Sequence, residues 1–327
     1  MDFAPSEREQ SVLDDARRVA PALAARAPEA DRDMRFPTDD LQDLRAAGLM
    51  ALAVPEEFGG RGASMVAYAL AAETIAAADA SLAVAWVMHT ACGWEIAHAG
   101  QPDTRTAVLA DVLNNGAFIC IAGAEGRLPD GTPCPLKADR EGDLWRLNGR
   151  KGFVSGVTAA SYVVTGGTDA EGTHHTFVVP MQTPGLCGSD VWDGMGMRAS
   201  ATHGLAFDCV VVPESNRLTA DYKTGDFRNT SALFGLGLSA TALGIAQAAL
   251  DFTIEWNKGK TLPDASKLRL GDMSVRVEAV RSLIWRSAWE ADRDPQNCEA
   301  WVDRSKTAAV EMAHGVALDA MRVCGGT

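Results

Sequence analysis

The order of hydrophobic and polar positions divides the chain into three regions. From residue 1 to about 115, leucine, isoleucine and valine recur at three- and four-residue spacing in alanine-rich sequence, and glycines and prolines interrupt the pattern. This pattern predicts four to six helices and no strand. Ser6, followed three residues later by Glu9, is typical of a capping box at the start of the first helix.

The middle region, residues 116–223, has short apolar runs that are rich in β-branched residues and bounded by glycine or proline. Their regular spacing predicts a small β-sandwich or barrel. Asp130-Gly131 and Asn148-Gly149 are dipeptides typical of turns between strands. The predicted strands are Phe118–Ala122, Leu144–Leu147, Phe153–Val154, Tyr162–Thr165, Thr176–Val179 and Leu205–Val212.

The last region, residues 224–327, returns to helical spacing and predicts an antiparallel bundle. Its segment Ser231–Ala249 has no charged residue and approaches the length needed to cross a bilayer. A helix buried on all sides has the same pattern, and we favour that interpretation because the segment contains several polar residues and no basic cluster follows it. The predicted helices are Phe234–Trp256, Leu268–Asp292 and Ala300–Cys324.

Composition and charge narrow the function classes. Hydrophobic residues make up 47% and charged residues 22% of the 327 residues, which is ordinary for a globular protein. The net charge of −13 argues against a nucleic-acid partner and against docking on an anionic membrane. The seven cysteines form no CxxC pair and the N-terminus has no secretory signal, so we expect reduced thiols in a cytoplasmic protein.

Common catalytic and cofactor motifs are absent from the sequence, including GxSxG, HExxH, the Walker-type phosphate loop and GxGxxG. Two adjacent histidines, His174 and His175, are the remaining candidates for a metal site. Neighbouring residues of a strand point to opposite faces, so we expect two solvent-exposed histidines and no metal.

Four motifs, taken in order, resemble those of the acyl-CoA dehydrogenase superfamily over essentially the whole chain. They are a PEE-GG turn, a glycine-lysine-aromatic strand, a G-M-R-x-S-x-T stretch with the strand that follows it, and a terminal GG. They correspond to Val54–Gly60, Gly149–Gly156, Gly196–Thr202 with Phe207–Pro213, and Cys324–Gly326.

The resemblance implies an α+β fold of the acyl-CoA dehydrogenase type. Residues 1–115 form its N-terminal helical domain, residues 116–223 its middle β-barrel or sandwich domain, and residues 224–327 its C-terminal helical bundle, which we expect to be incomplete at its end. The resemblance also implies FAD at the junction of the middle domain and the bundle, in a homodimer or homotetramer.

Four positions correspond to flavin contacts of the family. Phe153 is the aromatic residue expected against the isoalloxazine ring, and Ser155 is the hydroxyl expected near flavin N5 and O4. A core aromatic and a strand-end hydroxyl are the alternatives. Ala122 stands where the family has a threonine beside the flavin, and the serine that meets the thioester arm is missing. Lys258, or its neighbour Lys260, replaces a pyrophosphate-binding arginine by a point charge.

The catalytic base has no family-matched position within residues 1–327. The dehydrogenases use a carboxylate beyond the terminal GG or on the first long helix of the bundle, where this chain has Phe234. Either the sequence ends before the base or the chemistry differs. His89 and Arg198 are the candidates for the substrate pocket. A packing histidine and a surface ion pair are their alternatives.

The resemblance therefore implies a flavin-dependent oxidoreductase, foremost an acyl-CoA or acyl-carrier thioester dehydrogenase that forms an α,β-double bond. The alternative is a two-component flavin monooxygenase of the same fold, which takes FMN or reduced flavin from a reductase. A non-catalytic flavin-fold binding module is the third possibility. An electron-transfer flavoprotein or a flavin reductase is the partner implied by the first or second function.

Overall fold

The computed structural model describes residues 4–219 and 227–325, which form two compact units. One unit contains the chain up to residue 25, residues 64–84 and the chain from residue 231. The other contains residues 26–63 and 85–230. The boundary predicted between residues 223 and 224 and the second glycine of the terminal GG lie outside the described residues.

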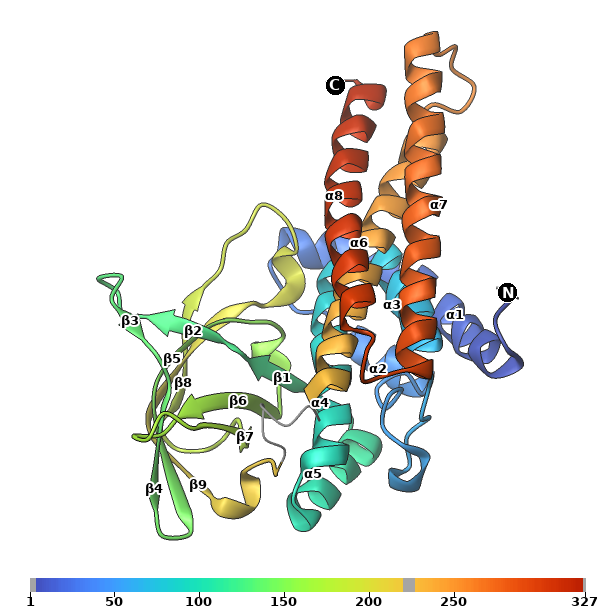
Figure 1. The fold of residues 1–327 in the computed structure, drawn as a ribbon. Coiled ribbons are helices and arrows are strands. Elements are labelled where there is room, and N and C mark those ends of the chain that lie inside the picture. Colours follow the sequence, from blue (N-terminus) through green and yellow to red (C-terminus); the bar gives the residue numbers. More distant parts are fainter. Residues whose placement is uncertain (1–3, 220–226, 326–327) are drawn as a thin grey trace. The chain divides into compact units, whose positions relative to one another are not determined.

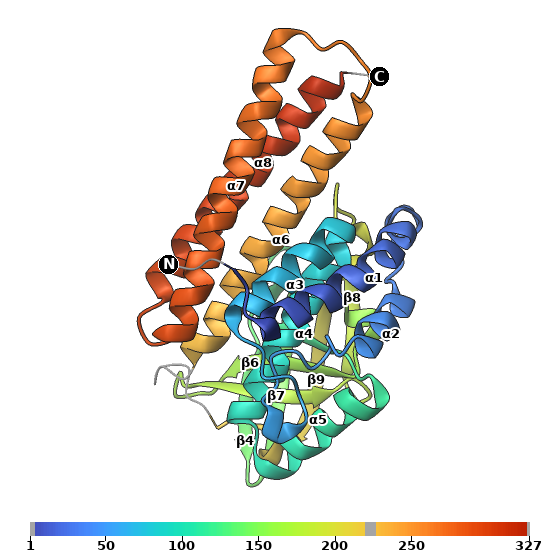
Figure 2. The same cartoon turned by 90° about the vertical axis from the view of Figure 1, so that its right-hand side faces the viewer.

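The first unit is helical and includes the C-terminal bundle, whose long helices run side by side in Figures 1 and 2. The capping box predicted at the first helix is confirmed, because Ser6 N donates to the Glu9 carboxylate at 2.7 Å and Glu9 N donates to Ser6 Oγ at 3.3 Å. Its helices are the first part of α1 (Glu7–Arg32), α3 (Met65–Ala78), α6 (Phe227–Trp256), α7 (Asp264–Arg293) and α8 (Glu299–Cys324).

Helix α6 packs closely on α3. A Cβ added at Gly244 would lie 2.5 Å from the Glu73 carbonyl oxygen, and the hydroxyl of Tyr68 donates to the Leu233 carbonyl at 3.1 Å. By length and composition alone, Thr230–Trp256 is apolar enough to cross a membrane, yet 61% of its apolar window is buried inside the protein. This burial favours the core-helix interpretation of the uncharged segment.

The second unit joins three helices to a strongly curled sheet, shown in green and yellow in Figure 1. Its helices are α2 (Thr38–Ala46), most of α4 (Ala80–Ala99) and α5 (Pro102–Asn115). Together with α1 and α3, the described part of the first 115 residues has five α-helices and no strand, in agreement with the sequence pattern. The strands are β1 (Ile119–Ala122), β2 (Ala124–Arg127), β3 (Pro133–Cys134), β4 (Lys137–Glu141), β5 (Leu144–Val154), β6 (Tyr162–Thr168), β7 (His174–Pro180), β8 (Leu186–Val191) and β9 (His203–Pro213).

Strand β5 organises the sheet. It pairs antiparallel with β2, β4 and β9, and β9 pairs in turn with β8. On the other side, β6 pairs parallel with β1 and antiparallel with β7. The two groups meet where β4 pairs with β6 at Lys137 and Thr168. This arrangement gives the curled sheet of the region where a small β-sandwich or barrel is predicted.

One predicted turn is wrong. Asn148-Gly149 lies inside β5, so two segments predicted as separate strands form one strand of 11 residues. A bulge against β9 accommodates the pair, and Gly149 has a φ of 146°. A Cβ at this position would lie 2.6 Å from the Pro135 carbonyl oxygen, so the glycine serves close packing rather than a turn. Asp130-Gly131 does form a turn, with Gly131 at φ 87°.

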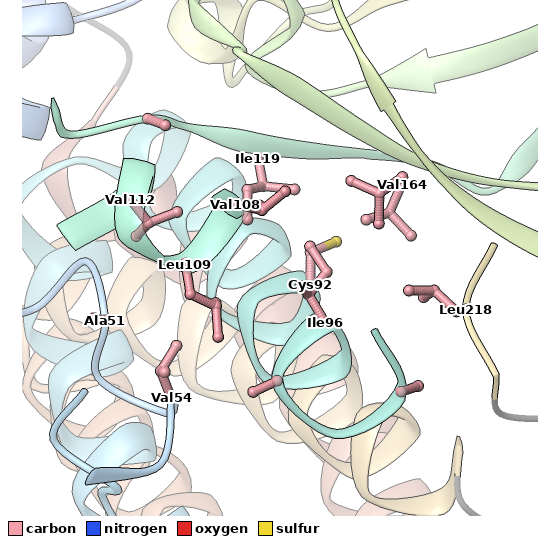
Figure 3. Packing of buried hydrophobic residues seen from close by; sticks show 14 residues of the cluster. Ala51, Val54, Cys92, Ile96, Val108, Leu109, Val112, Ile119, Val164 and Leu218 are labelled. Carbon is pink, nitrogen blue, oxygen red and sulfur yellow. The ribbon is translucent and has the colours of Figure 1, made fainter. Parts of the chain in front are cut away.

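Helices α4 and α5 pack against the β1–β6 side of the sheet through a hydrophobic cluster (Figure 3). Cys92 and Ile96 of α4 meet Ile119 of β1 and Val164 of β6 in this cluster. Through this cluster, β1, which ends at Ala122, packs against helices α4 and α5. It also includes Ala51, Val54, Val108, Leu109, Val112 and Leu218.

Candidate functional site

Phe153 lies at the end of β5 and points out of the sheet. Its side chain is 67% exposed, and its backbone has a φ of 54°, which is uncommon for a residue other than glycine. The pairing of β5 with β9 is irregular between Lys151 and Val154. The exposure contradicts the core-aromatic alternative. A strained backbone that presents an aromatic ring to the surface is typical of a ligand site.

Trp192 forms a second aromatic wall that the sequence did not single out. Its ring is 41% exposed and meets Phe153 edge to face, with 6.4 Å between ring centroids and 78° between planes. The indole packs on Gly194, where an added Cβ would lie 2.6 Å from it. Trp192 N donates to the Thr202 carbonyl at 3.1 Å. The two rings therefore bound a corner suited to a flat heterocycle.

Three hydroxyls form a chain beside this corner. Ser155 Oγ is 2.9 Å from Thr202 Oγ1, which is 2.7 Å from Ser200 Oγ. Ser200 and Thr202 are buried and Ser155 is half-buried, so Ser155 is the outer end of the chain. Gly156 N donates to the Ser200 carbonyl at 2.7 Å and fixes the two segments together.

Arg198 lies in a tight turn before β9. Arg198–Ser200 form a 3-10 turn between Met197 and Ala201, whose φ angles are 54° and 43°. Such left-handed φ angles are uncommon for residues other than glycine, so this turn is a strained part of the backbone.

The Arg198 guanidinium holds the loop that carries Trp192. Its Nη1 donates to the Asp193 carboxylate at 2.6 Å and to the Gly194 carbonyl at 3.3 Å, and its Nε donates to the Asp31 carbonyl at 3.3 Å. These contacts hold the loop in place, and the pair with the exposed Asp193 fits the surface ion-pair alternative. A substrate contact of Arg198 stays a prediction.

An ion pair with a buried lysine and a half-exposed glutamate lies two residues before Phe153. Lys151 is 2% exposed, and its Nζ lies 2.6 Å from Glu125 Oε1 across the β2–β5 ladder. Glu125 Oε2 also accepts the backbone N–H of Leu136 at 2.9 Å. Burial lowers the pKa of Lys151, and Glu125 opposes that shift. The pair ties β2 to β5 next to the exposed aromatic ring.

His89 is buried in α4 and uses both ring nitrogens. Ile119 N donates to Nδ1 at 3.0 Å, so Nε2 carries the proton that is donated to the Met50 carbonyl at 2.8 Å. The ring stacks on Phe118, with 5.1 Å between centroids. Burial lowers the pKa of His89 to about 4, so the ring is neutral at pH 7. These contacts favour the packing alternative, because neither nitrogen is free for a substrate in this arrangement.

The two other predicted cofactor positions lie apart in the chain and belong to different units. Ala122 is buried at the end of β1, and its carbonyl accepts the hydroxyl of Thr165 at 3.1 Å. Lys258 lies after α6 in the helical unit, is exposed, and pairs with Glu255 at 3.2 Å. Their flavin roles stay predictions.

The prediction of two exposed histidines is wrong for His175. Its Nε2 lies 2.8 Å from an Asp169 carboxylate oxygen, and its ring lies against Trp145, with 4.5 Å between centroids. The side chain is only 15% exposed, whereas His174 is exposed. Among the described residues, no group of three or more histidine, cysteine or acidic side chains could hold a metal ion.

Glu95 is a buried carboxyl that the sequence did not single out. It lies on α4, is 3% exposed, and its Oε1 has no hydrogen-bond partner among the described residues. Burial raises its pKa to about 7. The thiol of Cys92, one turn earlier, has a raised pKa because of its own burial and the nearby Glu95 charge.

The fold and its similarity to known proteins define the chain as an α+β flavoprotein oxidoreductase with helical ends and a curled middle sheet. It belongs to the acyl-CoA dehydrogenase family, whose members depend on FAD. The family's N-terminal, middle and C-terminal domains match residues 6–115, 132–210 and 235–327. The predicted family and fold class are thereby confirmed, while the predicted domain limits stay predictions.

Three similar proteins illustrate the relationship. The mitochondrial short-chain specific acyl-CoA dehydrogenase of Bos taurus is 31% identical over 317 residues, which cover 92% of this chain and 76% of the relative. The structure of butyryl-CoA dehydrogenase from Megasphaera elsdenii has a TM-score of 0.91 at 25% identity and covers 100% of this chain and 90% of its own. KijD3 in complex with FMN and dTDP-3-amino-2,3,6-trideoxy-4-keto-3-methyl-D-glucose has a TM-score of 0.88 at 25% identity and covers 99% of this chain and 85% of its own.

Proposed function

We propose that the protein oxidises an acyl thioester to its α,β-unsaturated product with bound FAD. The observation that carries the proposal is the exposed ring of Phe153 beside the outer hydroxyl of Ser155. The names of the Bos taurus and Megasphaera elsdenii proteins, both acyl-CoA dehydrogenases, support this reaction class. CoA and a carrier protein are both possible acyl carriers.

The residues at the end of β5 fit a flavin. Phe153 offers an uncovered aromatic face, Trp192 offers a perpendicular wall, and Ser155 offers a hydroxyl whose neighbours are already hydrogen-bonded. When bound, FAD supplies the two-electron acceptor of the reaction. Phe153 would stack on its ring, Ser155 would hydrogen-bond its polar edge, and Trp192 would keep water from that edge. We assign no residue as the base.

A flavin monooxygenase is the second candidate. It is favoured by the similarity to KijD3, whose structure contains FMN. Anaerobic mixing of the flavin-loaded protein with acyl-CoA separates the two functions. Bleaching of the flavin absorbance supports the dehydrogenase. No bleaching, with oxygen-dependent product formation from reduced flavin, supports the monooxygenase. If neither result is obtained, the non-catalytic binding module is the remaining function.

The expected protein partner differs between the two candidate functions. A dehydrogenase needs an electron acceptor such as an electron-transfer flavoprotein, and a monooxygenase needs a flavin reductase. We also propose a cytoplasmic location, which is supported by seven cysteines that are all free.

Replacing Phe153 with alanine is expected to weaken FAD binding about tenfold, because an aromatic face against the ring is lost. Equilibrium titration of flavin fluorescence measures the effect. Phe153→Trp is the matched control, since it keeps an aromatic face and is expected to bind near the wild-type level. Unchanged affinity in a folded Phe153→Ala variant would contradict the flavin assignment.

We propose that a second copy of the chain covers the bundle, giving a homodimer or homotetramer. Helices α6, α7 and α8 carry exposed apolar side chains that a monomer would leave in water. A closed symmetric assembly of the same bundle is the common way to cover such a face. These side chains include Phe252, Ile254, Trp256, Leu268, Val275, Val310 and Met321.

Light scattering of the purified protein at micromolar concentration is expected to give a multiple of 34.6 kDa. Val275→Glu is expected to shift the protein toward the monomer, because a charge would be buried in the interface. Leu128→Glu, at an exposed residue of the other unit, is the control. A wild-type protein that stays a monomer would overturn the assembly.

A further inference from the structure

We propose that Thr202 and Ser200 are positioning residues that hold the Ser155 hydroxyl as a hydrogen-bond donor to the oxidised flavin. The inference rests on the proposed flavin site. Thr202 lies 47 residues from Ser155 in the chain, and the turn through Ala201 brings the two side chains within 2.9 Å.

The direction of the hydroxyl chain follows from the burial of its inner end. Ser200 is 1% exposed, and within the described residues its Oγ makes one hydrogen bond, to Thr202 Oγ1. A buried hydroxyl proton that is not donated costs about 1–3 kcal/mol, so Ser200 donates to Thr202. Thr202 is buried as well, and once it accepts from Ser200 its remaining partner is Ser155 Oγ, so Thr202 donates its proton to Ser155. The Ser155 proton is left to be donated outward, beside Phe153.

This direction matters because the two redox states of a flavin differ at the ring nitrogen that takes up hydrogen. That nitrogen accepts a hydrogen bond when oxidised and carries a hydrogen when reduced. A hydroxyl held as a donor therefore binds the oxidised state more tightly than the reduced state. The chain of Ser200, Thr202 and Ser155 therefore sets the relative affinity for oxidised and reduced flavin. A freely rotating serine could instead donate to the oxidised state and accept from the reduced state.

The test measures the affinity of Thr202→Val for oxidised and reduced FAD and the midpoint potential of the bound flavin. We expect the preference for oxidised over reduced FAD to fall by up to about tenfold, because the freed Ser155 hydroxyl can also accept from the reduced ring, and this raises the two-electron potential by up to about 30 mV. The double variant Ser200→Ala/Thr202→Val removes the inner hydroxyl as well, so no buried donor is orphaned, and should show the same shift if Thr202→Val folds poorly. Thr202→Ser keeps the hydroxyl and should restore the wild-type potential.

Thr104→Val is the control. Thr104 is a half-buried residue of α5 in the same unit, and its hydroxyl donates to the Ser215 carbonyl at 2.7 Å, outside the chain of three. A shift of the same size in Thr104→Val, an unshifted potential in folded Thr202→Val and in the double variant, or a shifted potential in Thr202→Ser each overturns the proposal. A wild-type protein that binds no flavin overturns the proposed function instead, so the two failures are distinguishable.

Discussion

Replacing Glu125 with glutamine is expected to lower the free energy of unfolding by about 3 kcal/mol, which is at the lower end for a broken buried ion pair. Lys151 would keep a charge in a nearly fully buried position without its carboxylate partner. The lower end applies because about half of the Glu125 side chain is exposed. Urea unfolding at pH 7 measures the loss.

Two further variants separate the buried charge from other effects. Glu125→Gln/Lys151→Met removes both charges and should recover most of the lost stability. Glu141→Gln breaks an exposed pair with Arg146 and should cost much less stability, because solvent screens the two charges. The explanation that the unpaired charge of Lys151 causes the instability is refuted if the double variant stays as unstable as the single one. It is also refuted if Glu141→Gln destabilises the protein equally.

The pH dependence of Glu125→Gln gives an independent check. Without its partner, the pKa of Lys151 in the folded protein falls further below its ordinary value, because burial is then unopposed. The unfolded chain therefore binds more protons than the folded one as the pH rises toward 10. The variant should regain stability over this range relative to wild type.

The fold was largely predictable because its helices bury continuous apolar faces. The three helices predicted in the last region all lie inside α6, α7 and α8, with ends that extend a few residues further. Strand ends were less predictable. The Asn-Gly pair of β5 has the composition of a turn, but packing against Pro135 and Leu136 makes it a bulge. Such a contact between segments leaves no local pattern.

The candidate site was predictable only where a motif marks it. Phe153 and Ser155 follow from the family resemblance, whereas the roles of Trp192 and Thr202 depend on a loop with left-handed residues at Met197 and Ala201. Neither methionine nor alanine favours that conformation, so no local preference indicates the turn. The corner of rings and the chain of hydroxyls are therefore visible in the folded structure alone.

Glutamine at position 95 is expected to remove a pH dependence of stability worth about 3 kcal/mol in the wild-type protein. Burial raises the pKa of Glu95 from 4.5 to about 7 in the folded protein, so the folded state holds a proton that the unfolded chain releases. Stability from the neutral carboxyl is therefore fully present below pH 4.5 and is lost as the pH rises through 7. Glutamine cannot ionise, so its variant should not show this loss.

Urea unfolding of wild type and Glu95→Gln at pH 5 and pH 8 measures the difference. The comparison is made between the two proteins because other buried acids, such as Asp292 with its raised pKa, also contribute to the wild-type profile. Glu57→Gln, at an exposed position of the same unit, should leave the profile unchanged. If Glu95→Gln loses as much stability as wild type between the two pH values, then Glu95 is already ionised in the folded protein. A buried carboxylate would in that case need a cationic or donor partner, and its Oε1 has none among the described residues.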